Sequence, residues 1–203
     1  MKDGLPGGTA RAHGYTTGMR PLVLLDVDGV LNALGPPDGS WDDWRYGSAA
    51  ALGRDWPIRF SPTVVTAVRG WTETADVNWL TTWGHEANTG LGDLLGLAEL
   101  PVAGTPDGPT EPAAQTVGAL SAVTPAAPDR LTGRWWKLDV VRALVGRQPG
   151  RRLVWVDDDL AADPAGRAWV RGHADCLLVA PDPLTGLVAG QLAAVAAFLL
   201  ASQ

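Results

Sequence analysis

The chain has 203 residues, which is enough for one α/β domain but short for two. Its 46% hydrophobic and 19% charged residues are typical of a globular protein, and a net charge of −6 argues against broad, non-specific binding to nucleic acids or membrane surfaces. The longest apolar stretch, 187–201, is too short to span a bilayer, and residues 1–18 lack the apolar core of a signal peptide. We therefore expect a cytoplasmic protein in which residues 1–18 form a disordered extension before a single domain, 19–203.

After residue 20 the predicted elements alternate between strand and helix. The expected strands are 21–26, 76–80, 100–103, 153–156 and 176–179. The expected helices are 61–72, 86–95, 133–145, 164–171 and 187–201, the first starting with Ser61 at the N-cap and Pro62 at N1. This alternation is typical of an α/β, Rossmann-like three-layer sandwich with a central parallel sheet of about five strands.

Two insertions interrupt this pattern. Residues 35–57 are rich in Pro, Gly and Asp and contain several aromatic residues, so they predict a loop or a short hairpin, which we call the flap. Residues 104–130 are rich in proline and predict a long loop, with at most one helical turn near 115–120. A loop of that length in a compact domain is usually functional or mobile.

Two carboxylates stand at the end of the first predicted strand. Asp26 and Asp28 follow the apolar run 22–25 and precede Gly29. Side chains at i and i+2 of a strand point to the same side, where two like charges repel unless a cation or a shared proton offsets them. The pattern predicts a magnesium site and a carboxylate with a chemical role, against the alternative of a simple Asp-Gly turn.

Other polar residues follow further strands. Thr81 follows the strand expected at 76–80, and the triplet 157–159 follows the strand at 153–156. In an open parallel sheet these ends lie along one edge, where ligands bind. Each residue alone could be only the first solvated position after a strand, but three coinciding positions favour a shared site.

Four short motifs, taken in order, resemble those of the haloacid dehalogenase (HAD) superfamily, whose members are mostly magnesium-dependent phosphatases. They are DVDGVLN at 26–32, Thr81 within NWLTTW at 78–83, Lys137 within WWKL at 135–138, and VWVDDD at 154–159. The resemblance covers residues 20–200. Because the insertions are small, the chain is similar to the small-cap members of this superfamily, which tend to have open sites that admit bulky or macromolecular substrates.

The resemblance implies a role for each motif residue. Asp26 would attack phosphorus and form an aspartyl phosphate. Asp28 would donate a proton to the leaving oxygen and later activate water. Thr81 and Lys137 would bind phosphoryl oxygens, with a solvated helix lysine as the alternative interpretation of Lys137.

The same resemblance implies that Mg²⁺ is the cofactor. Mg²⁺ prefers oxygen ligands and retains waters, so a few carboxylates suffice to hold it. The expected ligands are Asp26, Asp158 and the backbone carbonyl of Asp28, with Asp157 as a water-mediated or lysine-orienting partner. Asp159 is expected to be a helix N-cap.

Residues that could contact the substrate are less well defined by the sequence. Thr82 is an alternative to Thr81, and His85 could touch substrate or could lie on the surface at a helix start. In the flap, Trp44 and Arg45 could stack on a nucleobase, although a packing role is the alternative for the flap aromatics.

Together these features predict a Mg²⁺-dependent phosphomonoester hydrolase that acts through an aspartyl phosphate on Asp26. Its partner would be a phosphorylated substrate, either a small molecule or a nucleic-acid end. One alternative is a phosphatase specific for nucleotides or nucleic-acid ends, because the sequence around Thr81 resembles that of small HAD proteins, some linked to RNA repair. A second alternative is a non-catalytic binding protein with a HAD fold.

Overall fold

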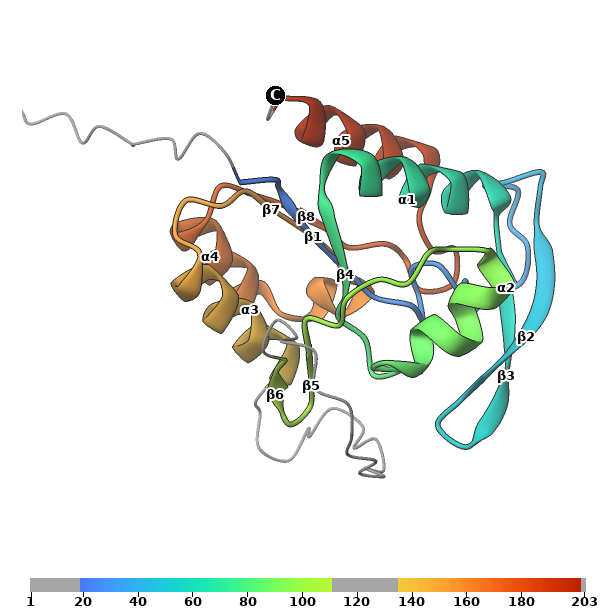
Figure 1. Ribbon diagram of the computed structural model, residues 1–203. Coiled ribbons are helices and arrows are strands. Elements are labelled where there is room, and N and C mark those ends of the chain that lie inside the picture. Colours follow the sequence, from blue (N-terminus) through green and yellow to red (C-terminus); the bar gives the residue numbers. More distant parts are fainter. Residues whose placement is uncertain (1–18, 111–134, 202–203) are drawn as a thin grey trace, which may run out of the picture.

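The computed structural model describes residues 19–110 and 135–201, and its centre is a four-stranded parallel sheet (Figure 1). The strands are β1 (Leu22–Leu25), β4 (Asp76–Trp79), β7 (Leu153–Val156) and β8 (Cys176–Val179), in the order β4-β1-β7-β8. β1 and β7 are fully buried and apolar throughout, as expected of strands covered on both faces. The predicted α/β, Rossmann-like class is confirmed.

The sheet has four strands rather than five in the described part of the chain, because the segment at 100–103 contributes only a single bridge. Val102 pairs with Trp79, and the Trp79 N–H donates to the Pro101 carbonyl at 2.8 Å. Proline has no N–H, so Pro101 cannot donate the next bond of a parallel ladder. The segment therefore lies along β4 without becoming a strand.

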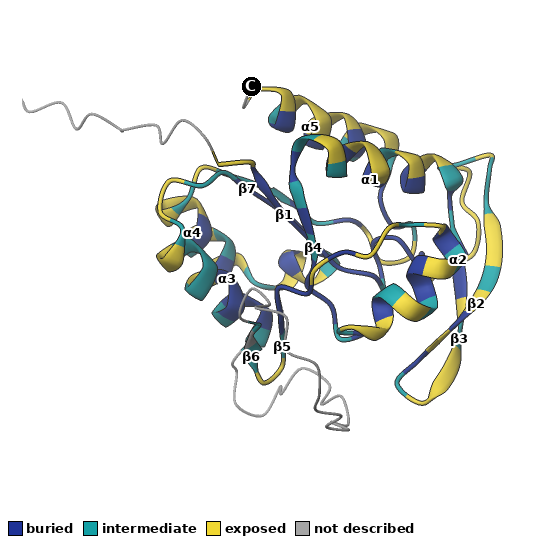
Figure 2. Cartoon of the chain, viewed as in Figure 1, coloured by how far each residue is buried: buried dark blue, intermediate teal, exposed yellow. Residues whose placement is uncertain are grey.

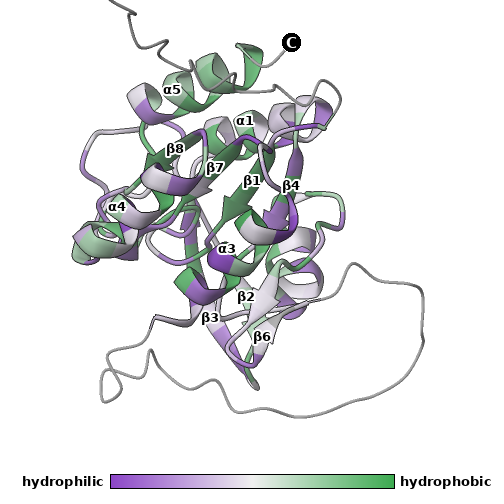
Figure 3. Cartoon of the chain, turned by 90° about the vertical axis from the view of Figure 1, so that its left-hand side faces the viewer, coloured by the Kyte–Doolittle hydropathy of each residue, from purple (hydrophilic) through white to green (hydrophobic). Residues whose placement is uncertain are grey.

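Two pairs of helices cover the sheet and complete three layers. α1 (Pro62–Thr74) and α5 (Ala189–Leu200) pack on one face, and α3 (Trp136–Arg147) and α4 (Pro164–His173) pack on the other. Alternation along β1 divides the core, because Val23 and Leu25 face the α1–α5 side while Leu22 and Leu24 face the α3–α4 side. Burial concentrates on the strands and the inner helix faces (Figure 2), and hydrophobic residues fill the sheet behind α3 and α4 (Figure 3). Among the described helices, none has the length and apolar character needed to cross a membrane.

Shorter elements join these layers. The helix predicted at 86–95 is a π-helical turn, η1 (Ala87–Gly92), continued by α2 (Asp93–Leu95). The start of the predicted proline-rich loop is a small hairpin of β5 (Gly104–Thr105) and β6 (Gly108–Pro109). Its remainder, including the helical turn expected near 115–120, lies outside the described residues, as does the extension expected at 1–18.

The flap contains a regular antiparallel hairpin, β2 (Arg45–Ala51) and β3 (Arg54–Phe60), which extends beyond the predicted end at residue 57. Its two-residue turn has positive φ at Leu52 and Gly53, as this type of hairpin turn requires. The hairpin packs on η1 so closely that a Cβ on Gly90 would lie 2.2 Å from the Ala50 carbonyl oxygen. The flap is therefore anchored in the core rather than free over the sheet edge.

Candidate active site

The carboxyl ends of β1, β4 and β7 border a cavity of about 160 Å³. Its lining residues are Asp26, Asp28, Leu34, Thr82, Trp135, Trp136, Lys137, Asp158 and Asp159. Several of these side chains, such as Thr82 and Asp158, are only half-buried and Asp159 is exposed, so the cavity is open to solvent. Four carboxylates and a single ammonium among these residues make its wall strongly acidic.

Asp26 and Lys137 form a buried ion pair at the base of this cavity. The Lys137 Nζ donates to Asp26 Oδ2 at 2.5 Å, and the Val27 backbone N–H donates to Asp26 Oδ1 at 2.8 Å. Asp26 lies directly after β1, and Lys137 lies in the first turn of α3, so two rigid elements fix the pair. Such fixation gives one defined position to the carboxylate and to the positive charge beside it.

Asp157 holds Lys137 from the other side. Its Oδ2 accepts from Lys137 Nζ at 2.9 Å and from the Trp155 indole at 3.3 Å, and its Oδ1 accepts from the Asp159 N–H at 3.1 Å. Asp157, not Asp159, is therefore the N-cap of the following 3₁₀ helix, η2 (Asp158–Ala162). The side chain is completely buried and does not line the cavity.

Asp158 is the half-buried carboxylate that faces the cavity from the β7 end. Its carboxyl group lies against Gly29, where an added Cβ would come within 2.6 Å of Asp158 Cγ. Gly29 also has φ +70°, a conformation that favours glycine. Gly29 therefore allows the loop after β1 and the loop after β7 to bring their carboxylates together.

Asp28, in the loop after β1, is oriented by two side-chain donors. Asn32 Nδ2 and Trp83 Nε1 each donate to one Asp28 carboxylate oxygen at 2.8 Å. Asn32 in turn accepts the Arg59 N–H at 3.0 Å, which ties the Asp28 loop to the base of the flap hairpin. Each carboxylate oxygen can accept two hydrogen bonds, so capacity for a reacting group or a water remains.

Burial and charge determine the protonation of this cluster. Burial alone would lower the pKa of Lys137, but the charges of Asp157 and Asp26 offset it and hold the pKa above its usual range. Burial raises the pKa of Asp157, while Lys137 opposes that shift. Burial, followed by the charges of Asp26 and Asp159, raises the pKa of Asp158 to about 6. The cavity therefore presents a fixed lysine cation and a carboxyl that titrates just below neutral pH.

The oxygen atoms at this edge fit a hard divalent cation. Asp26, Asp157 and Asp158 each offer a carboxylate oxygen, and these atoms lie within 4.8 Å of one another. Asp157 is the weaker candidate of the three, because both its oxygens already accept protein hydrogen bonds and it is outside the cavity lining. Asp26 and Asp158, which line the cavity together with Asp28, form the more suitable oxygen set.

The two candidate threonines occupy different environments. Thr81 is buried, and its Oγ1 accepts the Trp83 N–H at 3.4 Å. Thr82 is half-buried and lines the cavity. Both lie just past β4, at the expected edge of the sheet, but only Thr82 has a surface in the cavity.

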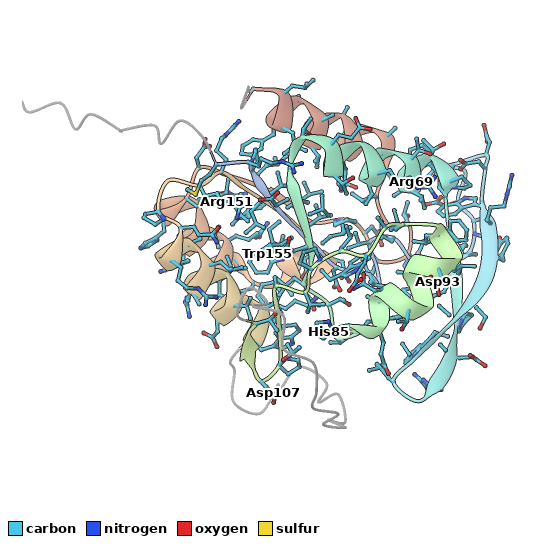
Figure 4. All side chains as sticks on the ribbon, viewed as in Figure 1. Arg69, His85, Asp93, Asp107, Arg151 and Trp155 are labelled. Atoms are coloured by element: carbon cyan, nitrogen blue, oxygen red, sulfur yellow. The ribbon has the colours of Figure 1, made fainter. Side chains whose placement is uncertain are left out.

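The other residues considered for substrate contact lie outside the cavity lining. His85, labelled in Figure 4, is exposed ahead of η1. Trp44 packs under the Arg59 guanidinium, 4.6 Å from ring centroid to Cζ, and Arg45 donates to the carbonyl of Trp44 at 3.0 Å. The structure therefore brings together Asp26, Asp28, Lys137, Asp158 and Thr82, but not His85, Trp44 or Arg45.

Further residues contribute to the site although no sequence pattern assigns them a functional role. Trp83 reaches Asp28 from 55 positions away along the chain, which no local pattern indicates. Trp135 and Trp136 form part of the cavity wall, and Trp135 stacks on Trp155 at 4.9 Å between ring centroids. Asn32 could have been noticed, because it stands four residues after Asp28 in a turn and amide side chains often bond locally in such turns.

Comparison with known proteins gave one informative result. A family model described as the HAD domain in Swiss Army Knife RNA repair proteins matches residues 22–192, which include all the residues lining the cavity. Searches of curated proteins and of solved structures gave no match.

Proposed function

We propose a function from the premise that this chain belongs to the family of HAD domains in Swiss Army Knife RNA repair proteins. The proposed activity is Mg²⁺-dependent hydrolysis of a phosphomonoester at a nucleic-acid end, through an aspartyl phosphate on Asp26. The observation that carries this proposal is the contact of Asp26 with Lys137 in a cavity that also exposes Asp28 and Asp158.

Asp26, Asp158 and the backbone carbonyl of Asp28 are the proposed Mg²⁺ ligands. The acidic wall supports this assignment, because a phosphate dianion would be repelled by four carboxylates that face only one lysine. When bound, Mg²⁺ neutralises part of this charge and polarises a phosphoryl oxygen. Asp157 contributes indirectly by holding Lys137 at 2.9 Å.

The protein's own groups account for the proton and bond changes. An Asp26 carboxylate oxygen forms a bond to phosphorus as the bond from phosphorus to the substrate oxygen breaks. Asp28 gives its proton to that leaving oxygen, then takes a proton from water as the water attacks phosphorus. The bond between Asp26 and phosphorus breaks, and inorganic phosphate leaves. Lys137 and a threonine hydroxyl, from Thr81 or Thr82, stabilise the phosphoryl oxygens during both steps.

Two observations support a nucleic-acid end as the substrate. The family to which the chain belongs is described from RNA repair proteins. The cavity, at about 160 Å³, is smaller than the roughly 300–1,000 Å³ of most small-molecule sites, so it suits a phosphoryl group whose remainder stays outside. An open cavity of this kind is compatible with the end of a polymer.

A substrate panel tests this proposal. Purified protein is incubated with 5′- and 3′-phosphorylated RNA and DNA oligonucleotides, nucleoside monophosphates and sugar phosphates, with Mg²⁺ or with EDTA, and released phosphate is measured. The expected result is Mg²⁺-dependent release from at least one oligonucleotide end, lowered about 10⁴-fold or more in Asp26→Asn. Equal release by both proteins, or release unaffected by EDTA, would contradict the proposal. Absence of release from every substrate would favour a non-catalytic binding role.

A further inference from the structure

Trp136 is a half-buried indole in the cavity wall that packs against the core beneath α3 and, among the described residues, has no polar or aromatic partner. It is the first residue of α3, directly before Lys137. In the described part of the chain it makes no hydrogen bond, ring contact or cation–π contact, whereas its neighbour Trp135 stacks on Trp155. Large indoles usually bury their surface and pair their N–H, so a half-buried indole beside a reaction centre whose N–H has no partner among the described residues suggests a ligand contact.

The backbone on both sides of Trp136 is held in place. Trp135 is fixed by its stack on buried Trp155, with an interplanar angle of 20°, and Lys137 is fixed by Asp26 and Asp157. Figure 4 labels Trp155 in the interior of the molecule. The Trp136 ring is therefore presented by rigid neighbours, and binding a ligand on it would cost little conformational entropy.

The flap aromatics, by contrast, pack away from the cavity, although the buried indole N–H of Trp44 has no hydrogen-bond partner among the described residues. Trp41 donates its indole N–H to the Leu187 carbonyl at 2.9 Å, and Trp44 lies under Arg59. Neither residue lines the cavity, and Figure 1 shows the flap on the opposite side of the molecule from α3. The aromatic surface next to the reacting groups is thus on α3.

The surroundings of Trp136 indicate the chemistry of its ligand. A phosphoryl group next to Asp26 and Lys137 would leave the attached nucleoside at the cavity mouth, where Leu34 is also 56% exposed. Lys137 is the only cation among the described lining residues, so neighbouring phosphates find no second charge there. An aromatic face with an exposed leucine suits a planar, apolar surface such as a nucleobase.

We propose that Trp136 is the stacking platform for the terminal nucleobase of the substrate and that Leu34 adds a second apolar contact. This inference rests on the proposed function and names the part of the substrate that is recognised. Stacking tolerates any base, because every base has a π-face. The platform would therefore select a nucleotide end over a phosphate without a base, with little preference for base identity.

The test compares two oligonucleotides that differ only in the terminal base. One carries a normal phosphorylated nucleotide at the end that the wild type hydrolyses, and the other carries a phosphorylated abasic ribose. The wild type should prefer the normal end by about 5- to 150-fold in kcat/KM. Trp136→Ala should lower this preference to near one, Trp136→Phe should retain part of it, and Leu34→Ala should lower it slightly. Trp169→Ala, on α4 and outside the cavity lining, is the matched control and should retain the full preference.

Several outcomes would overturn the inference. One is an equal loss of kcat/KM on both oligonucleotides in Trp136→Ala, and another is an unchanged base preference in that variant. A third is a loss of base preference in Trp44→Ala instead. The same comparison by equilibrium binding, with Asp26→Asn in Mg²⁺ as the background, does not depend on turnover. If the wild type hydrolyses neither end, the proposed function fails, while stronger binding of the normal end that depends on Trp136 would still support the platform.

Discussion

The loops after β1 and β7 both carry closely spaced aspartates, but the loop after β1 places both of its aspartates in the cavity lining, whereas the loop after β7 keeps its first one outside. After β1 the first carboxylate, Asp26, enters the cavity and contacts Lys137. After β7 the first carboxylate, Asp157, is fully buried and holds Lys137 from outside the cavity, while the second, Asp158, faces the cavity. Identical side chains at equivalent strand ends thus acquire different roles, because burial and hydrogen-bond donors differ around each.

Lys137 connects the two loops, so its removal should have the largest effect. Lys137→Met leaves the buried carboxylates of Asp26 and Asp157 without a cation, and the free energy of unfolding should fall by roughly 3–5 kcal/mol. Turnover should fall about 10²- to 10³-fold. Urea denaturation and phosphate release measure the two effects. Arg142→Met removes an exposed guanidinium from the same helix and should change stability by less than about 1 kcal/mol. Equal stabilities of the two variants would contradict the role of Lys137.

The two aspartates after β7 should respond differently to the same substitution. Asp158→Asn should weaken Mg²⁺ binding about 10- to 100-fold without lowering the free energy of unfolding of the metal-free protein, because it removes a carboxyl that burial disfavours in its charged form. Asp157→Asn should lower the free energy of unfolding by about 1–3 kcal/mol, because three hydrogen bonds to a buried carboxylate are weakened while Lys137 retains Asp26. Isothermal titration calorimetry and urea denaturation measure both quantities. A loss of Mg²⁺ affinity in Asp157→Asn together with a loss of stability in Asp158→Asn would contradict these two assignments.

The raised pKa of Asp158, about 6, gives Mg²⁺ binding a pH dependence. Because the ligand must be ionised, affinity should fall by about tenfold per unit as pH drops below about 6. In the metal-free protein the raised pKa has the opposite effect on folding stability: the free energy of unfolding falls, rather than rises, as pH increases. A carboxyl whose pKa is higher in the folded than in the unfolded state lowers stability as pH rises from about 4 to about 6, and Asp157 acts in the same direction. Isothermal titration calorimetry from pH 5 to 7.5 should find that Mg²⁺ affinity falls toward low pH in the wild type and changes less in Asp158→Asn. Identical pH profiles of Mg²⁺ affinity in the two proteins would contradict the raised pKa of Asp158.

Gly29→Ala should have the smallest effect, and it tests how the two loops meet. The substitution places a Cβ 2.6 Å from Asp158 Cγ at a residue with φ +70°. We expect a loss of about 1–2 kcal/mol in stability and weaker Mg²⁺ binding, although no ligand has been removed. Gly70→Ala within α1, where a Cβ meets open space, is the control and should stabilise the protein by up to about 1 kcal/mol. Unchanged Mg²⁺ affinity in Gly29→Ala would show that Asp158 does not depend on this close approach.

The elements and the strand-end residues could be predicted from the sequence because they depend on local patterns. Apolar runs followed by Asp26 or Asp157 mark parallel strands whose carboxyl ends share one edge, and the structure brings these residues together around Lys137. The fifth strand was wrong because one missing N–H, at Pro101, ends a ladder that an apolar pattern alone favours.

The walls of the cavity could not be predicted, because they depend on packing between distant segments. The contact between Trp83 and Asp28 joins residues 55 positions apart, and nothing local distinguishes Trp83 from the other tryptophans. The same limit explains why the sequence pattern points to the flap, rather than to α3, for an aromatic surface that contacts the substrate. Only the folded chain shows that Trp44 lies under Arg59 while Trp136 borders the reacting carboxylates.

The assignment of Asp26 as nucleophile is the central claim, and trapping the covalent intermediate tests it most directly. Protein turning over a ³²P-labelled end with Mg²⁺ is quenched in acid and digested, and the labelled peptide is identified by mass spectrometry. If Asp26 is the nucleophile, the label is found as an acyl phosphate on Asp26 and is absent in Asp26→Asn and in EDTA. Label on another residue, or a catalytically active wild type that never becomes labelled, would contradict it.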